Sequence, residues 1–236
     1  MYYKNFSKVY DKFMKHCDYN EWSDLIKSKI KESGVEGKKL LDLGCGTGET
    51  LLRLKDDFDC SGLDLSADML TIANKKLKNK NVKLYLGDMR EFNTNETYDI
   101  ILSLFDTVNH LTSLKDLDEL MKSIYDNLNP GGVYIFDVIN REFMDKMFPG
   151  GLYYDDRKDM TIIWEHFREK ELDIIEAVYF IKNRAGHYEK LKELYEKRIF
   201  EEFEIRKIIE KNNLNLLSIG KNDRIAGERF FYMVKK

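Results

Sequence analysis

Proline and cysteine are scarce in this chain. Its 236 residues include two prolines and three cysteines. Cys17, Cys45 and Cys60 are an odd set without close pairs, so the sequence predicts neither a disulfide framework nor a metal site. Because free thiols stay reduced in the cytoplasm, we expect the protein to reside there.

Long apolar segments and blocks of basic charge are absent as well. The first residues contain no apolar signal core, and no uncharged stretch approaches the ~18 to 20 residues needed to cross a membrane. The 39 basic residues are scattered among 42 acidic ones, giving a formal net charge of -3. Proteins that bind nucleic acid usually carry a positive stripe that neutralises phosphates. The charge pattern therefore disfavours a nucleic-acid partner, without excluding transfer RNA, and we expect no membrane partner.

The remaining composition is that of a folded globular protein. Hydrophobic residues make up 43% of the chain, charged residues 34% and aromatic residues 13%. These proportions are too apolar and too aromatic for disorder, and the length is sufficient for one domain with a sizeable core. The sequence leaves the oligomeric state open between a monomer and a homodimer.

Apolar runs alternate with helical patterns along the first 140 residues. The expected strands span 39–43, 59–63, 82–86, 98–104 and 133–138. The expected helices span 22–30, 49–54, 66–77 and 113–128, with Asn20 or Ser23 as candidate caps of the first. Regular alternation of strands and helices predicts a parallel sheet that is covered on both faces.

The pattern changes after residue 139. Segments 161–168, 172–182 and 188–199 mix apolar and charged residues around turn signals, as antiparallel strands do. A helix at 201–212 and strands at 214–219 and 229–234 then follow. We therefore predict an α/β fold with a doubly wound, mostly parallel seven-stranded sheet. Residues 1–138 and 199–236 would form its core, and residues 139–198 an inserted antiparallel β meander.

A glycine-rich turn follows the first expected strand. Gly44, Gly46 and Gly48 lie between a strand and a helix, where bare backbone can approach a ligand. Asp64 stands twenty residues beyond Gly44, at the end of the second strand. This spacing suits a carboxylate that accepts hydrogen bonds from both ribose hydroxyls of an adenosyl group. A tight turn with a purely structural role is the other interpretation.

Glu49 distinguishes between two kinds of adenosyl ligand. A dinucleotide fingerprint requires glycine at this position, so that the helix start can hold a pyrophosphate. A carboxylate there repels phosphates but not a sulfonium ligand, which has none. The sequence thus favours a sulfonium cofactor. A nucleotide-dependent oxidoreductase on the same scaffold, and a cofactor-binding protein without turnover, remain as alternatives.

Four segments resemble class I S-adenosylmethionine-dependent methyltransferases, in the order that this family has them. They are Leu40 to Glu49, Leu63 to Ser66 with Met69 and Leu70, Gly87 to Met89, and Leu128 to Gly132. Residues 3–11 and the insertion more loosely resemble a bacterial small-molecule subgroup. The resemblance implies a Rossmann-like fold, S-adenosylmethionine as cofactor, and in-line transfer of its methyl group to nitrogen or oxygen of a small molecule. Under this hypothesis the insertion forms a lid that determines acceptor choice.

The resemblance also implies roles for the residues around the glycine turn. Gly44 and Gly46 would line the methionine and ribose moieties, with the backbone of Cys45 between them. Asp64 would hold the ribose hydroxyls.

Residues after the second and third strands are implied to hold the adenine. Leu65 and Met69 would pack on the ring, and Asp88 would accept a hydrogen from its amino group, with Met89 alongside. Packing in the core is the alternative for Leu65 and Met69, and capping of a turn is the alternative for Asp88.

The resemblance places further residues near the sulfonium. Leu104 and Phe105 would lie beside it, at the carboxyl end of the fourth strand. Tyr3, Tyr10 and Trp22 would close over the cofactor from the N-terminal side. Aromatic residues of this kind more often pack in a core.

Methyl transfer requires the acceptor's lone pair to be aligned behind the methyl carbon, so positioning could supply most of the catalysis. A protonated amine or a hydroxyl must also lose a proton. Asp106 and His110 are the best-placed catalytic candidates, because both follow the fourth strand. Histidine has the more suitable ordinary pKa. A structural role is the alternative for His110.

Overall fold

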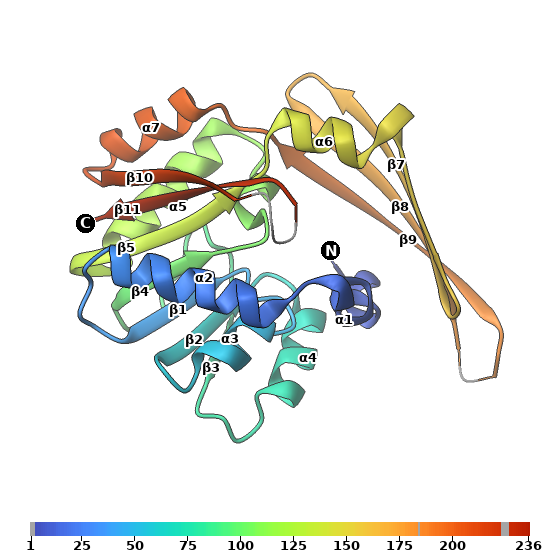
Figure 1. Cartoon of the computed structure of the whole chain (residues 1–236), viewed down its shortest axis with the longest axis horizontal. Coiled ribbons are helices and arrows are strands. Elements are labelled where there is room, and N and C mark those ends of the chain that lie inside the picture. Colours follow the sequence, from blue (N-terminus) through green and yellow to red (C-terminus); the bar gives the residue numbers. More distant parts are fainter. Residues whose placement is uncertain (1–2, 184, 223–226) are drawn as a thin grey trace.

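The computed structural model describes residues 3–183, 185–222 and 227–236, whose strands form two sheets (Figure 1). The larger sheet has seven strands in the order β10-β11-β5-β4-β1-β2-β3. Its strands are β1 (Lys39–Leu43), β2 (Asp59–Asp64), β3 (Lys83–Leu86), β4 (Tyr98–Ser103), β5 (Leu128–Val138), β10 (Asn215–Asn222) and β11 (Arg229–Lys235). The first five are parallel, and β11 and β10 are antiparallel additions beyond β5. The predicted fold class is confirmed.

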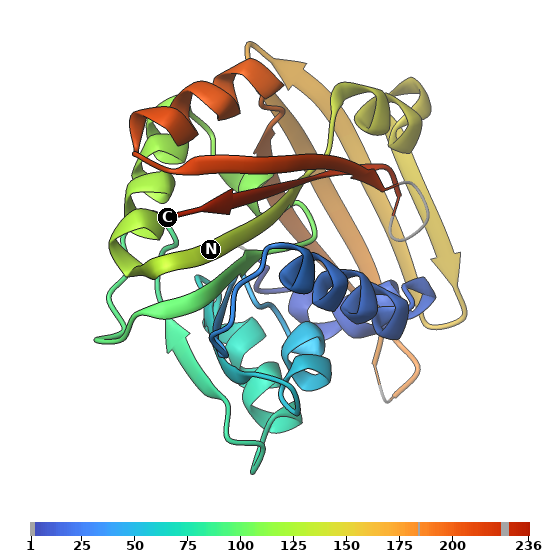
Figure 2. The ribbon, with the colours of Figure 1, turned by 60° about the vertical axis from the view of Figure 1, so that its left-hand side comes forward.

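Helices cover both faces of this sheet (Figure 2). On one face lie α2 (Tyr19–Glu32), α3 (Glu49–Leu54) and α4 (Ala67–Lys76), and on the other lie α5 (Leu114–Asn127) and α7 (Glu202–Lys211). Successive strand residues point to opposite faces. Accordingly Leu40 packs with the α2 side and Leu41 with the α5 side, and both are fully buried. A strand covered on both sides is therefore apolar throughout.

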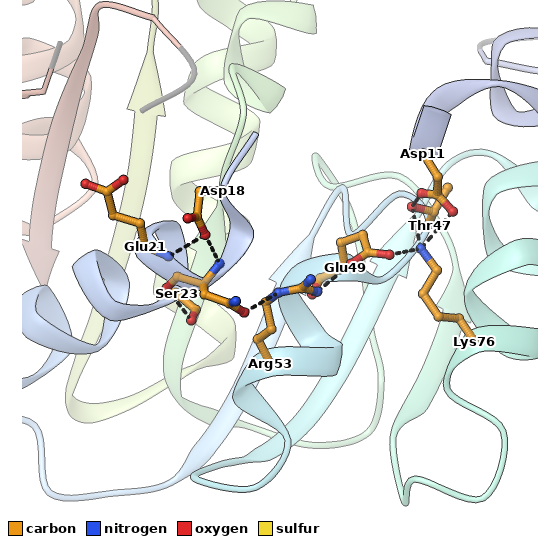
Figure 3. Close-up of polar contacts among 9 residues, drawn as sticks. Asp11, Asp18, Glu21, Ser23, Thr47, Glu49, Arg53 and Lys76 are labelled. Carbon is orange, nitrogen blue, oxygen red and sulfur yellow. Dashed lines mark hydrogen bonds and ion pairs between the residues drawn. The ribbon is translucent and has the colours of Figure 1, made fainter. Parts of the chain in front are cut away.

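The helix caps follow the sequence signals only in part. Ser66 caps α4 as predicted, because its hydroxyl accepts the Met69 N–H at 3.3 Å. The candidate caps of α2 were wrong. Asp18 is the N-cap residue, and one carboxylate oxygen accepts the N–H groups of Asn20 and Glu21 (Figure 3). The helix begins at Tyr19, three positions before Trp22, so Asn20 lies inside its first turn.

The second sheet has four antiparallel strands in sequence order. They are β6 (Leu152–Arg157), β7 (Met160–Glu169), β8 (Leu172–Lys182) and β9 (Tyr188–Arg198), and helix α6 (Arg141–Met147) precedes them. The sequence indicated only the last three strands. Asp155 and Asp156 give β6 a poor intrinsic preference for a strand, and its pairing with β7 compensates for this.

The N-terminal segment joins the second sheet to the core. It comprises η1 (Phe6–Lys8), α1 (Tyr10–Phe13) and η2 (Met14–His16), and it lies between α2 and the second sheet (Figure 1). The Phe6 ring stacks on Tyr179 of β8 at a centroid distance of 5.2 Å. The N–H groups of Asn5 and Phe6 donate to the Glu193 carboxylate of β9 at 2.7 and 3.1 Å. The second sheet is thus held through this segment.

Two further observations concern the cysteines and the helices. Cys17, Cys45 and Cys60 are all buried free thiols. Within residues 3–183, 185–222 and 227–236, no helix combines the length and apolar character that a membrane crossing requires.

Replacing the buried Phe6 should loosen the second sheet. Phe6→Ala removes a ring that is 3% exposed, and we expect it to lower the free energy of unfolding by about 3 kcal/mol. Phe203→Ala is the control because that ring is 70% exposed, and it should change the value by less than about 0.5 kcal/mol. Urea denaturation measures both. Equal stability of the two variants would contradict the bridging role of the N-terminal segment.

Candidate functional site

A cavity of about 240 Å³ lies at the carboxyl ends of β1, β2 and β4. Ligands of open α/β sheets bind at this edge because the connecting loops leave a crevice there. The cavity brings together almost all of the residues that the sequence singled out: Tyr3, Tyr10, Gly44, Cys45, Gly46, Asp64, Leu65, Met69, Asp88, Met89, Leu104, Phe105 and His110. Trp22 and Asp106 do not line it.

The glycine turn and the carboxylate of β2 are direct neighbours. The Gly46 N–H donates to Asp64 Oδ2 at 2.8 Å, and the Ser66 N–H donates to Oδ1 at 2.8 Å. Gly44 has a φ of 75°, and a Cβ there would lie 2.5 Å from Cγ2 of Thr107. Glycine is therefore required at position 44 by its conformation and by its close approach to Thr107.

Two carboxyls from adjacent strands face the cavity: Asp42, which is buried, and Asp64, which is half-buried. Burial raises the pKa of Asp64, although the N–H groups of Ser66, Gly46 and Leu65 oppose this shift. Burial also raises the pKa of Asp42 to about 8, and the charge of Asp64 adds to the effect. The sequence analysis missed Asp42, whose signal was a carboxylate inside an otherwise apolar strand. Asp42 is therefore a neutral carboxyl at pH 7 and can donate a hydrogen bond, whereas Asp64 accepts N–H groups of the two loops beside it.

At the far end of the cavity, Asp88 is already engaged. Arg90 Nε and Nη2 donate to its carboxylate at 3.0 and 2.6 Å, which holds the pKa of Asp88 below its ordinary value. Arg90 also donates to Asp116 at 2.7 Å. The Arg90 backbone N–H also donates to Oδ1 at 2.9 Å, so each Asp88 oxygen already accepts two contacts. This ion-pair cluster could not be predicted from the sequence, because Asp116 lies 26 residues beyond Arg90.

The N-terminal aromatic residues divide into two groups. Tyr3 and Tyr10 line the cavity, as the sequence suggested. Trp22 is fully buried and lies outside the lining, because α2 directs it toward the sheet. Its ring stacks on Phe105 at a centroid distance of 4.3 Å, and Phe105 lines the cavity. Trp22 therefore supports a cavity residue from behind.

Asp106 is held away from the cavity by two cations. Its carboxylate pairs with Arg229 at 2.8 Å and with Lys197 of β9, while its N–H donates to Asp137 at 2.9 Å. Burial opposes ionisation, but Lys197 and Arg229 outweigh it and hold the pKa of Asp106 well below its ordinary value. A carboxylate stabilised in this way is a poor proton acceptor. Asp106 instead ties the loop after β4 to β9 and β11.

His110 lines the cavity and is the other catalytic candidate. Its Nε2 lies 2.8 Å from the Tyr3 hydroxyl. Burial and the charge of Lys197 together lower the pKa of His110 to about 3, although Asp106 opposes them, so the imidazole is neutral at ordinary pH. Its Nδ1 is buried and has no hydrogen-bond partner within the described part of the chain.

A chain of polar contacts ties the glycine turn to the N-terminal segment (Figure 3). The Thr47 hydroxyl donates to Asp11 of α1 at 2.5 Å, and Lys76 of α4 pairs with Asp11 at 2.9 Å and with Glu49. Arg53 pairs with the other Glu49 oxygen. Thr47 and Glu49 both line the cavity. The contacts of Asp11 with Thr47 and Lys76 could not be predicted from the sequence, because they join residues far apart in the chain.

The fold and the cavity together define a class of protein. A doubly wound sheet places a glycine turn beside a half-buried carboxylate, in a cavity whose wall also carries Glu49 and Asp42. Glu49 at the start of α3 occupies the place where a helix N-terminus would hold a pyrophosphate, whereas a sulfonium ligand carries no phosphate and is accommodated there. The fold and the site are those of a Rossmann-like protein that binds an adenosyl sulfonium.

Comparison with known proteins agrees with this class. A family model described as "Methyltransferase domain" matches residues 40–132. The putative methyltransferase YqeM of Bacillus subtilis is 34% identical over 210 residues, which is 86% of this chain and 83% of the relative. The crystal structure of a S-adenosylmethionine-dependent methyltransferase from Clostridium acetobutylicum superposes with a TM-score of 0.87 at 28% identity, covering 99% and 98% of the two chains. The chain belongs to the class I S-adenosylmethionine-dependent methyltransferases.

Membership in this family confirms the predicted cofactor, S-adenosylmethionine, and the predicted transfer of its methyl group. A relative with a named acceptor is a dTDP-3-amino-3,4,6-trideoxy-alpha-D-glucopyranose N,N-dimethyltransferase of Streptomyces venezuelae. It is 34% identical over 140 residues, which is 58% of each chain. The structure of Streptomyces venezuelae DesVI has the same fold, with a TM-score of 0.81 over 97% of this chain and 98% of that chain, at 24% identity.

The raised pKa of Asp42 should make stability depend on pH. Between the ordinary pKa of 3.8 and about 8, the folded protein keeps the Asp42 proton while the unfolded chain has lost it. Stability therefore falls as pH rises through this window, by about 1.4 kcal/mol per pH unit for one such proton. Asp42→Asn should lack this contribution. Denaturation of both proteins from pH 5 to 7 measures the difference, and parallel curves would contradict the assignment.

Proposed function

We propose that this methyltransferase holds S-adenosylmethionine through the Gly46–Asp64 pair and transfers its methyl group to an amine of a small molecule. The observation that carries the proposal is the bond from the Gly46 N–H to the Asp64 carboxylate, at the wall of a cavity. The backbone of Gly44 and Cys45 would border the methionine and ribose moieties. The remaining acceptor positions of Asp64 would take the ribose hydroxyls.

The rest of the cavity fits the same ligand. Leu65 is exposed and Met69 buried on the wall where an adenine ring would pack, with Asp88 and Met89 next to them. Leu104 and Phe105 would border the sulfonium, together with Tyr3 and Tyr10. When bound, the cofactor supplies an activated methyl group with a good leaving group. The protein's part is then to orient the acceptor and exclude water.

Two observations support an amine as the acceptor. The relative from Streptomyces venezuelae is named for dimethylation of an amino sugar nitrogen. In this chain, the neutral His110 lines the cavity and can accept a hydrogen bond from an acceptor N–H. His110 would thus orient the nitrogen lone pair, and the Tyr3 hydroxyl would hold the imidazole ring in place. Asp106 would not accept a proton but would hold the loop after β4 against β9 and β11.

We further propose that residues 139–198 form a unit on the acceptor side of the cavity, against a core of residues 1–138 and 199–236. The contacts of β9 with the loop after β4 support this division. The substrate would be a small molecule and not a nucleic acid. The reaction would take place in the cytoplasm.

Asp64→Ala should sharply weaken adenosyl ligands. Hydrogen bonds to charged groups contribute about 1.5 to 3 kcal/mol, so losing the ribose contacts should raise the Kd at least about tenfold. Asp59→Ala is the matched control, because Asp59 is exposed at the start of the same strand. Calorimetry with S-adenosylhomocysteine gives both values. Undiminished affinity of Asp64→Ala would refute the ribose assignment.

His110→Ala should lower turnover more than cofactor binding. We expect kcat to fall about tenfold or more while the Kd of S-adenosylhomocysteine changes little, because the lost contact is to the acceptor. The wild-type rate should show no inflection near the ordinary histidine pKa, since burial keeps His110 neutral. The control is His187→Ala in the exposed turn before β9. A rate unaffected by His110→Ala would make this histidine structural.

A further inference from the structure

Glu196 is the contribution of the second sheet to the cavity wall. Of the described residues between 139 and 198, it alone lines the cavity. Its position on β9 is fixed from both sides, since Tyr195 lies against Tyr3 at a centroid distance of 5.1 Å and Lys197 pairs with Asp106. Glu196 thus belongs to the wall that β9 forms beside Tyr3 and the loop after β4.

The charge of Glu196 is not neutralised by its surroundings. It is half-buried, and no ion pair or hydrogen bond joins it to another residue in the part of the chain that the structure describes. Lys197 is paired with Asp106. Arg90, the basic residue of the cavity wall, is paired with Asp88 and Asp116. The acceptor side of the cavity therefore carries an uncompensated carboxylate.

A second observation on the same wall points to a nitrogen ligand. The Nδ1 atom of His110 is buried without a partner, although buried polar atoms are nearly always hydrogen-bonded. A neutral imidazole and a free carboxylate that line the same cavity offer acceptor positions for a group with several N–H bonds. A hydroxyl has one hydrogen and cannot satisfy both.

We propose that Glu196 selects an amine over a hydroxyl as methyl acceptor; this inference rests on the proposed function. The amine lone pair forms the new N–C bond, the C–S electron pair stays on sulfur, and the positive charge passes to nitrogen, which then loses a proton to solvent. A carboxylate beside that nitrogen stabilises the developing charge. A hydroxyl must instead become an anion, which the same carboxylate repels.

The test uses sinefungin, a cofactor analogue that carries a primary ammonium in place of the methyl sulfonium group. Calorimetry would compare its Kd with that of S-adenosylhomocysteine, which has no charge at that position. Glu196→Gln should weaken sinefungin about threefold to tenfold and leave S-adenosylhomocysteine within about twofold. Glu196→Asp should retain the preference for sinefungin. Glu176→Gln, on the exposed part of the neighbouring strand, is the control and should behave as the wild type.

The outcomes separate this inference from the proposed function. If the wild type binds S-adenosylhomocysteine but Glu196→Gln keeps the full preference for sinefungin, the role of Glu196 is wrong and the cofactor site stands. If the wild type does not bind S-adenosylhomocysteine, both fail. Glu196→Ala serves as a second neutral variant, and an unchanged S-adenosylhomocysteine Kd shows that each variant is folded. Methylation of hydroxyl compounds alone, in a screen of amino sugars and the matching sugars, would also overturn the inference.

Discussion

The hydrogen bond from the Gly46 N–H to the Asp64 carboxylate is the contact on which the site depends. It joins the loop after β1 to the end of β2, two neighbouring parallel strands, and so fixes the floor of the cavity. The same carboxylate also accepts the Ser66 N–H at the start of α4. One half-buried side chain thus sets the relative positions of two loops and a helix, while keeping acceptor capacity toward the cavity.

The N-terminal segment extends this control to the second sheet. Asp11 contacts Thr47 of the glycine turn, and Glu193 of β9 accepts the backbone N–H groups of Asn5 and Phe6. The aromatic ring of Phe6 fills the space beneath β8. The segment is therefore a connection between the cofactor side and the acceptor side of the cavity.

Burial gives similar groups different protonation states in this site. Asp106 remains ionised because two cations pair with it, whereas Asp42, which lacks such partners, has a raised pKa. His110 is neutral because it is buried near Lys197. The ordinary pKa values of aspartate and histidine therefore do not give the protonation states of these groups. Each group's role follows from the charges that the fold places around it.

The sequence by itself determined the doubly wound sheet, the glycine turn with Asp64, and the family, because these rest on local periodicity, short-range spacing and contiguous motifs. It could not separate Phe105, which lines the cavity, from Trp22, which packs behind it. Nor could it pair Asp106 with Arg229, 123 residues away, or bring Glu196 to the cavity. Only the tertiary structure decided these points, because burial and charge pairing depend on which distant segments the fold makes neighbours.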